Sequence, residues 1–165
     1  MDPKAYDALW GRHLDRLVLY AAALIGDRAA AEDAVQAVFL RILNSGRLPE
    51  PATETPYLFQ AVRNEVSNQR RSLRRAQAAF QGLFKAPAPS PAEAAELTEF
   101  ARQVQGVLQD LPEEEREAVV LKTLSNFSFP EGAAICGVSE KTFEHRYYRG
   151  LEVLRDKLGV KDEQS

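Results

Sequence analysis

The stretch SFPEGAAICGVSEKTF, residues 128–143, decides the fold of the C-terminal part of this chain. Ser128 is placed to cap a short first helix, and Gly137 supplies a tight turn after it. Ser139 is placed to cap a second helix, on which Phe143 would pack back onto the first. This order of caps, turn and apolar residues predicts a helix-turn-helix.

The second helix of such a motif places its first outward residues in the major groove of DNA. The candidate DNA-reading residues are Ser139, Glu140, Lys141, Thr142, Glu144, His145, Arg146 and Arg149. The three cations of this set suit phosphate or guanine, whereas its two glutamates must accept from a cytosine amino group or pair with a cation. Because cations barely exceed acids along this helix, we expect the domain alone to bind DNA weakly.

Helical patterns fill the rest of the chain, with apolar residues at three- and four-residue steps and no strand pattern. Helices are expected at about residues 5–25, 29–43, 57–75, 92–110, 113–123, 130–136 and 140–158. The run KAPAPSP at residues 85–91 favours an extended spacer, because alternating proline cannot continue a helix. The predicted fold is therefore all-α, with two small helical domains joined by a flexible linker. We assign the N-terminal domain to residues 1–78, the linker to 79–95 and the C-terminal domain, which contains the helix-turn-helix, to 96–160.

Charge is unevenly distributed along the chain, whose formal net charge is −3. Residues 60–75 hold five arginines and one glutamate, a local net charge of +4 that suits phosphate. Residues 93–117 hold eight acids and two arginines, a local net charge of −6. We interpret this acidic segment as a solvated helical face or a surface for a basic protein partner. The arginine cluster could instead be a solvated helix end.

Composition excludes several other classes of protein. No apolar run is long enough to span a membrane and no secretory signal is evident, so a cytoplasmic location is expected. The single cysteine, Cys136, is interpreted as a small buried hydrophobe. With it and only His13 and His145, neither a disulfide nor a zinc-ligand spacing exists. The two histidines lack a paired acid, and the prediction is that the chain is not an enzyme and needs no cofactor.

Three motifs occur in order along the chain. Residues 24–41 contain LIGD followed by AEDAVQAVFLR. Residues 56–65 read PYLFQAVRNE, and two arginines follow at 70–71. Residues 108–121 read LQDLPEEEREAVVL, and RYYRGLEVL follows the helix-turn-helix at 146–154. In spacing and order these motifs resemble the extracytoplasmic-function (ECF) class of bacterial RNA polymerase sigma factors, and the resemblance covers nearly the whole chain.

The resemblance implies a transcription initiation factor that binds core RNA polymerase, directs it to specific promoters and assists their opening. A polymerase-binding helix would dock on the clamp helices of the β′ subunit through Asp33, Gln36, Phe39, Leu40 and Arg41. Minus-ten promoter DNA would be held by Arg63, Asn64, Asn68, Gln69, Arg70, Arg71, Arg74 and Arg75. The helix-turn-helix would read the minus-thirty-five element. The implied partners are core polymerase (β′ clamp helices and β flap), promoter DNA and an anti-sigma factor, without membrane insertion.

The sequence departs from the family pattern at several positions. Ala37 stands where Glu is usual, which weakens the polar part of the polymerase contact, and Tyr57 replaces the usual Trp. Asn68 and Gln69 replace Asp-Arg, so strand opening is expected to differ. Gly132 replaces Ile or Val, which is expected to thin the core of the helix-turn-helix and to cost about 1 kcal/mol of helix propensity. One further departure is Glu144, in place of Lys or Arg.

Two other functions stay open from the residues alone. A DNA-binding regulator would keep the helix-turn-helix without programming polymerase, and the departures in the N-terminal half favour it. A sigma-like interaction module would have lost DNA binding and would use its acidic face to hold a partner. Weak, salt-insensitive DNA binding would indicate the module.

Overall fold

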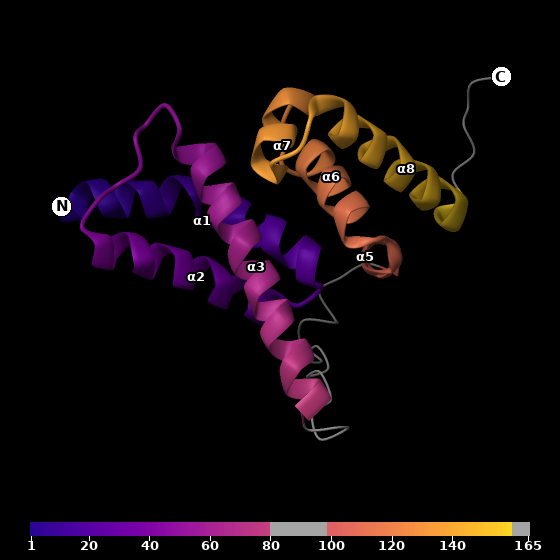
Figure 1. The fold of residues 1–165 in the computed structure, drawn as a ribbon, viewed down its shortest axis with the longest axis horizontal. Helices are drawn as coiled ribbons and strands as arrows, with labels where there is room; N and C mark the ends of the chain where they lie inside the picture. The colour runs from indigo at the N-terminus through magenta and orange to yellow at the C-terminus, as the bar shows by residue number, and fades with distance from the viewer. Residues whose placement is uncertain (80–98, 160–165) are drawn as a thin grey trace.

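The computed structural model describes residues 1–79 and 99–159, and every regular element in those ranges is an α-helix. The N-terminal domain consists of α1 (Pro3–Ile25), α2 (Arg28–Ser45) and α3 (Glu54–Ala79). The C-terminal domain consists of α5 (Glu99–Asp110), α6 (Glu113–Thr123), α7 (Phe129–Cys136) and α8 (Glu140–Leu158). Figure 1 shows the two groups of helices side by side. The all-α prediction with two helical domains is confirmed.

The segment predicted to link the domains, residues 79–95, lies outside the described residues except for residue 79, which ends α3. The start of the helix expected from residue 92 also lies outside them, and its described part begins at Glu99. The described part of the chain contains no helix long and apolar enough to cross a membrane.

The junction between α1 and α2 is built from two adjacent residues that the sequence marks as helix ends. Gly26 ends α1, and its N–H donates to the carbonyl of Ala22. Asp27 begins α2, where its carboxylate accepts hydrogen bonds from the N–H groups of Ala29 and Ala30. These bonds satisfy groups that a helix end leaves without partners, so the chain turns sharply and α2 packs along α1.

Aromatic side chains fill the core of the N-terminal domain. Phe39 contacts the edge of Trp10 with ring centroids 4.6 Å apart. Tyr20 and Phe59 lie 5.1 Å apart and are fully buried. Trp10 is only partly buried and packs against the core from its edge. These contacts hold α1, α2 and α3 together.

The prediction that His13 lacks an acidic partner is wrong. Glu54, the first residue of α3, places its Oε1 2.9 Å from Nε2 of the buried His13. Arg12 donates to the same carboxylate from the other side at 3.2 Å. The pair was missed because its members lie 41 residues apart in sequence. Its place at the start of α3 suits a structural role, in which it fixes α3 against α1.

The two domains pack directly against each other, α6 against α1 and α7 against α3. Phe59 of α3 contacts Phe127, which precedes α7, with ring centroids 4.8 Å apart. The guanidinium of Arg16 lies over both rings, 5.4 Å from the first and 5.6 Å from the second. Arg16 also donates to the carbonyl of Ser125 at 2.9 Å. The described residues therefore form a closed arrangement with an apolar contact at its centre.

Candidate nucleic-acid and polymerase interfaces

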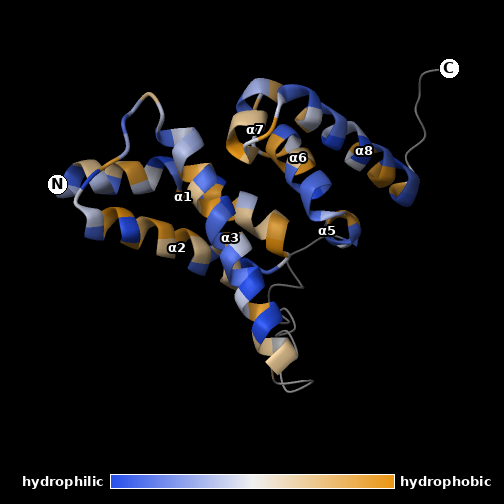
Figure 2. Cartoon of the chain, in the orientation of Figure 1, coloured by the Kyte–Doolittle hydropathy of each residue, from blue (hydrophilic) through white to orange (hydrophobic). Residues whose placement is uncertain are grey.

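The second half of α3 carries the predicted minus-ten surface, and Figure 2 shows much of this helix in the hydrophilic colours. Leu58, Phe59, Val62 and Val66 are buried, and beyond them the helix extends away from the core. Arg71, Arg74 and Arg75 are exposed, as are Asn64 and Asn68. Gln69 is half-buried and lies within hydrogen-bond distance of Glu65. The exposed arginines form a cationic strip that can accept a polyanion.

Arg63 and Arg70 belong to the same predicted set but are already engaged. The guanidinium of Arg63 is paired with Glu117 of α6. Arg70 is paired with Glu113 of α6 at 3.1 Å and donates to the carbonyl of Leu24. A polar hollow of about 230 Å³ lies between the two helices, and Arg71 and Arg74 also line it. The described conformation therefore offers only part of the predicted minus-ten surface to DNA.

The acidic start of α6 was not predicted to meet these arginines. The sequence suggested a solvated face or a surface for a basic partner, and the structure instead pairs four of its glutamates within the chain. Glu117 and Glu113 pair with Arg63 and Arg70 of the N-terminal domain. Glu114 pairs with Arg146 of α8 at 3.5 Å, and Glu115 pairs with Arg149 of α8 at 3.7 Å. The opposite local charges of the two segments were the available signal, but their spatial contact is a tertiary property.

The helix-turn-helix forms as predicted from its caps. The hydroxyl of Ser128 accepts from the N–H of Glu131 at 3.3 Å, and that of Ser139 accepts from the N–H of Thr142 at 3.2 Å. Gly137 ends α7 in the left-handed region, with φ of 68°, which glycine adopts without strain. Phe143 is fully buried between the helices.

Gly132 does not thin the core of the helix-turn-helix, and this expectation is corrected. A Cβ atom at this position would lie 2.3 Å from the Cζ atom of the Phe143 ring. The ring therefore fills the space that a larger side chain at residue 132 would occupy. The core keeps its volume at this point because an aromatic side chain of α8 occupies the space beside Gly132.

The start of α8 presents most of the predicted minus-thirty-five residues to solvent. The exposed members are Ser139, Glu140, Lys141, Thr142, Glu144, His145 and Arg149. Arg146 is half-buried beside Glu114. Because Ser139 and Thr142 also form the helix cap, their hydroxyls are partly engaged with each other, 2.9 Å apart. The face is nearly neutral, which suits weak duplex binding by this domain alone.

On α2, four of the five predicted polymerase-binding residues form an exposed strip. Asp33, Gln36, Leu40 and Arg41 face solvent, and Arg41 also pairs with Glu65 of α3 at 2.8 Å. The prediction that Phe39 contacts polymerase is corrected, because only 1% of its surface is exposed. Its ring packs on the core side of α2, so it positions the helix and does not offer a contact of its own.

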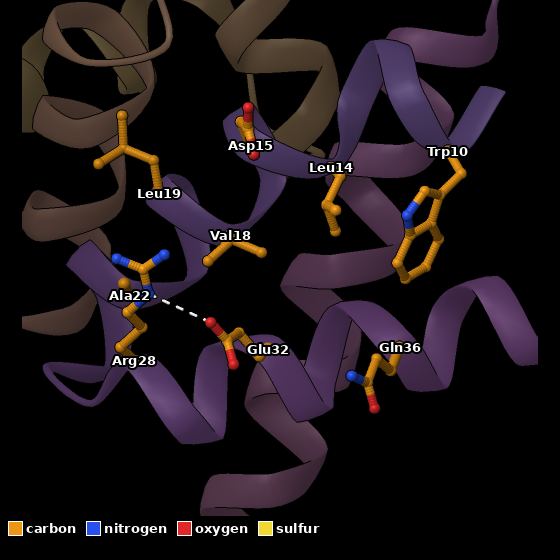
Figure 3. A pocket seen from close by; sticks show the side chains of 9 residues that line it. All are labelled: Trp10, Leu14, Asp15, Val18, Leu19, Ala22, Arg28, Glu32 and Gln36. Carbon is orange, nitrogen blue, oxygen red and sulfur yellow. Dashed lines mark hydrogen bonds and ion pairs between the residues drawn. The ribbon is translucent and has the colours of Figure 1, made fainter. Parts of the chain in front are cut away.

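A groove of about 480 Å³ runs between α1 and α2, next to this strip. In Figure 3, Trp10, Leu14 and Val18 stand between the two helices, and the pair formed by Arg28 and Glu32 closes one end at 3.1 Å. Gln36 belongs both to the strip and to the groove. The α1–α2 face therefore combines apolar area with a polar rim, as protein interfaces do.

This pairing of a helical domain bearing a cationic strip with a helix-turn-helix domain matches two known families. The sigma-70 region 2 family matches residues 9–76, and the sigma-70 region 4 family matches residues 101–154. The chain is therefore a sigma factor of the sigma-70 type.

The similar proteins define the class more closely. The chain is 33% identical over 156 residues to the RNA polymerase sigma factor CarQ of Myxococcus xanthus. The matched region covers 94% of this chain and 90% of CarQ. The chain is 32% identical over 158 residues to the ECF RNA polymerase sigma factor SigE of Mycolicibacterium smegmatis, covering 93% of this chain and 62% of SigE. The chain belongs to the ECF sigma factors, the class whose members direct RNA polymerase to promoters.

Among solved structures, the sigma factor RpoE of Bartonella quintana, in complex with the anti-sigma factor NepR, has a similar fold. It superposes with a TM-score of 0.80 at 28% identity, over 96% of this chain and 99% of RpoE.

Proposed function

We propose that this protein binds core RNA polymerase and places it on promoters through three separate surfaces. The exposed strip on α2, with Asp33, Gln36, Leu40 and Arg41, docks on the β′ clamp helices. The cationic half of α3 holds separated minus-ten strands, and the start of α8 reads the minus-thirty-five duplex. The C-terminal domain also contacts the β flap. The supporting observation is that three surfaces on different helices of one chain are solvent-exposed: the α2 strip, the start of α8, and Arg71, Arg74 and Arg75 of α3.

Tethering accounts for how weak surfaces would select a promoter. Each DNA-binding face has few unpaired cations, so each alone would bind with low affinity. Joined in one chain and held on polymerase, the second contact becomes intramolecular and the affinities combine. We assign residues 1–78 and 96–160 to the two domains and 79–95 to the tether. The protein acts in the cytoplasm without catalytic chemistry of its own.

An anti-sigma factor is the proposed regulatory partner. The similar RpoE was solved in complex with one. The α1–α2 groove beside the polymerase-binding strip gives this chain an apolar face on which a regulatory protein could compete with polymerase.

The test is run-off transcription from genomic fragments with core polymerase from the source organism. We expect discrete new start sites when the protein is added. The variant R71A/R74A, which removes two exposed cations of α3, should lower open-complex formation at least about tenfold and reduce the salt slope of single-strand binding by roughly one to two. The matched control K4A/R102A removes the same charge from exposed positions outside the proposed surfaces.

If the protein binds duplex DNA but no new transcripts appear, the protein is a DNA-binding regulator and the proposed sigma function is wrong. The residues that favour that second candidate are Ala37, Asn68 and Gln69, which depart from the family pattern at the polymerase and minus-ten surfaces. Silence in both assays would indicate a module that only binds a protein partner.

A further inference from the structure

The two domains are held together by ion pairs that engage predicted DNA-binding residues. Glu117 of α6 is 5% exposed and pairs with Arg63, and the hydroxyl of Tyr20 lies 3.5 Å from the same carboxylate. Burial, followed by the charge of Glu117, raises the pKa of Tyr20, so this hydroxyl stays protonated and can donate. One turn earlier, Glu113 pairs with Arg70 at 3.1 Å. Two carboxylates from one domain thus neutralise two arginines of the other.

A second set of contacts fixes the same arrangement through the backbone. The last carbonyls of α1 accept hydrogen bonds from three side chains of the C-terminal domain: Gln105 to Ala22 at 3.4 Å, Gln109 to Ala23 at 3.1 Å and Arg116 to Leu24 at 2.8 Å. The last carbonyls of a helix lack partners within it, and of these three only Ala22 also accepts from the N–H of Gly26. The C-terminal domain therefore acts as the cap of α1, and the closed arrangement is a specific contact between the domains.

We propose that this closed arrangement is autoinhibitory. Glu113 and Glu117 occupy, as substitutes for DNA phosphates, the guanidinium groups of Arg63 and Arg70 that the minus-ten strands require. Binding to polymerase separates the domains and frees both arginines. This inference rests on the proposed minus-ten role of α3 and adds to it a regulation that is internal to the chain.

Charge and burial explain why the contact would both hold and release. The pair at Arg70 is partly solvated and weak, whereas Glu117 is buried and must keep a partner as long as the domains stay closed. A polyanion competes for the same cations, and the observed affinity falls in proportion to the fraction of open molecules. Destabilising the closed state should therefore tighten DNA binding without any change in the DNA-binding side chains.

The test compares four full-length proteins: wild type, E113Q/E117Q, E113Q alone and the control D7N/E152Q. The control removes the same two negative charges at exposed positions of α1 and α8, outside the contact. Glutamine at residue 117 still fills the buried site, and E113Q changes an exposed residue that cannot prevent folding; circular dichroism checks both. The radius of gyration is measured by small-angle X-ray scattering. Affinity for a fluorescein-labelled single-stranded oligonucleotide of mixed sequence is measured by anisotropy.

We expect E113Q/E117Q to have a larger radius of gyration and to bind the oligonucleotide about tenfold more tightly than the control, with E113Q about threefold tighter. Values equal to those of D7N/E152Q would overturn the inference, and so would opening without a gain in affinity. The run-off assay with wild-type protein separates the two proposals. If the wild-type protein supports transcription but E113Q/E117Q behaves like the control, the proposed sigma function stands and only the proposed autoinhibition is wrong.

Discussion

Arg116 of α6 donates a hydrogen bond of 2.8 Å to the carbonyl of Leu24, the next-to-last residue of α1 in the other domain. The same guanidinium donates to the carbonyls of Leu108, Gln109 and Leu111 at the end of α5, at 2.7 to 2.9 Å. One buried side chain therefore serves two helix ends and joins the domains. Burial lowers the pKa of Arg116, yet an arginine stays protonated at neutral pH and keeps all its donors.

Replacing this residue should separate the unfolding of the two domains. We expect R116A to lower the free energy of unfolding by about 3 kcal/mol, because four carbonyls, three of them in buried hydrogen bonds, lose a donor. R116K should recover less than half of that loss, since one ammonium group cannot reach the same four acceptors. The measurement is urea unfolding followed by circular dichroism and by the fluorescence of Trp10, the chain's single tryptophan, in the N-terminal domain. Coincident curves at wild-type stability would show that Arg116 is dispensable.

Gly132 and Phe143 should show strong coupling. We expect G132A to lower the free energy of unfolding by about 1 to 2 kcal/mol, because the added methyl group meets a buried ring. The matched control is G106A, at an exposed helical glycine where a Cβ meets nothing, which should raise stability by up to about 1 kcal/mol. In the double variant G132A/F143L the cost should be less than the sum of the single costs. Strict additivity would show that residue 132 does not limit the ring.

The thiol of Cys136 should make the protein less stable at alkaline pH. Burial, followed by the nearby Glu117, raises its pKa to about 12. A group with a raised pKa in the folded state supports folding fully below its unfolded pKa, about 8.5, and loses that support as pH rises toward 12. Between pH 8 and pH 10 the wild type should therefore lose about 2 kcal/mol more than C136A.

Chemical denaturation at several pH values measures this difference, and reaction with Ellman's reagent gives an independent reading. The native thiol should react slowly at pH 8 and rapidly in urea, since only the thiolate is reactive. Parallel pH profiles for the two proteins, or fast native reaction, would contradict the burial of this residue.

The pair between Glu54 and His13 should contribute to stability only above acidic pH. The hydrogen bond with His13, with help from Arg12, lowers the pKa of Glu54 in the folded protein. Its contribution is present above the unfolded pKa, about 4.3, and is lost as pH falls through the lower folded value. E54Q should therefore destabilise the protein at pH 6 and much less at pH 3.5. The control E50Q changes an exposed glutamate, and a penalty for E54Q that is equal at both pH values would contradict the ionic role of the pair.

Local signals in the sequence account for most of what was predicted correctly. Ser128 and Ser139 cap the helices expected of them, because a cap depends on groups two or three residues away. The buried positions of Phe39, Phe59 and Phe143 follow from helical periodicity for the same reason. Phe39 was nevertheless included with its exposed neighbour Leu40 among the predicted polymerase contacts, because the family motif contains both.

The amino-acid sequence by itself determined the all-α class, the helix ends, the helix-turn-helix and the separation of a basic from an acidic segment, since each depends on residues close together in the chain. Only the tertiary structure decided that Phe143 fills the space beside Gly132, that Glu54 meets His13, and that Glu113 and Glu117 cover Arg63 and Arg70. These contacts join side chains from different helices. Their partners are selected by how the helices pack, and spacing along the chain carries no record of that packing.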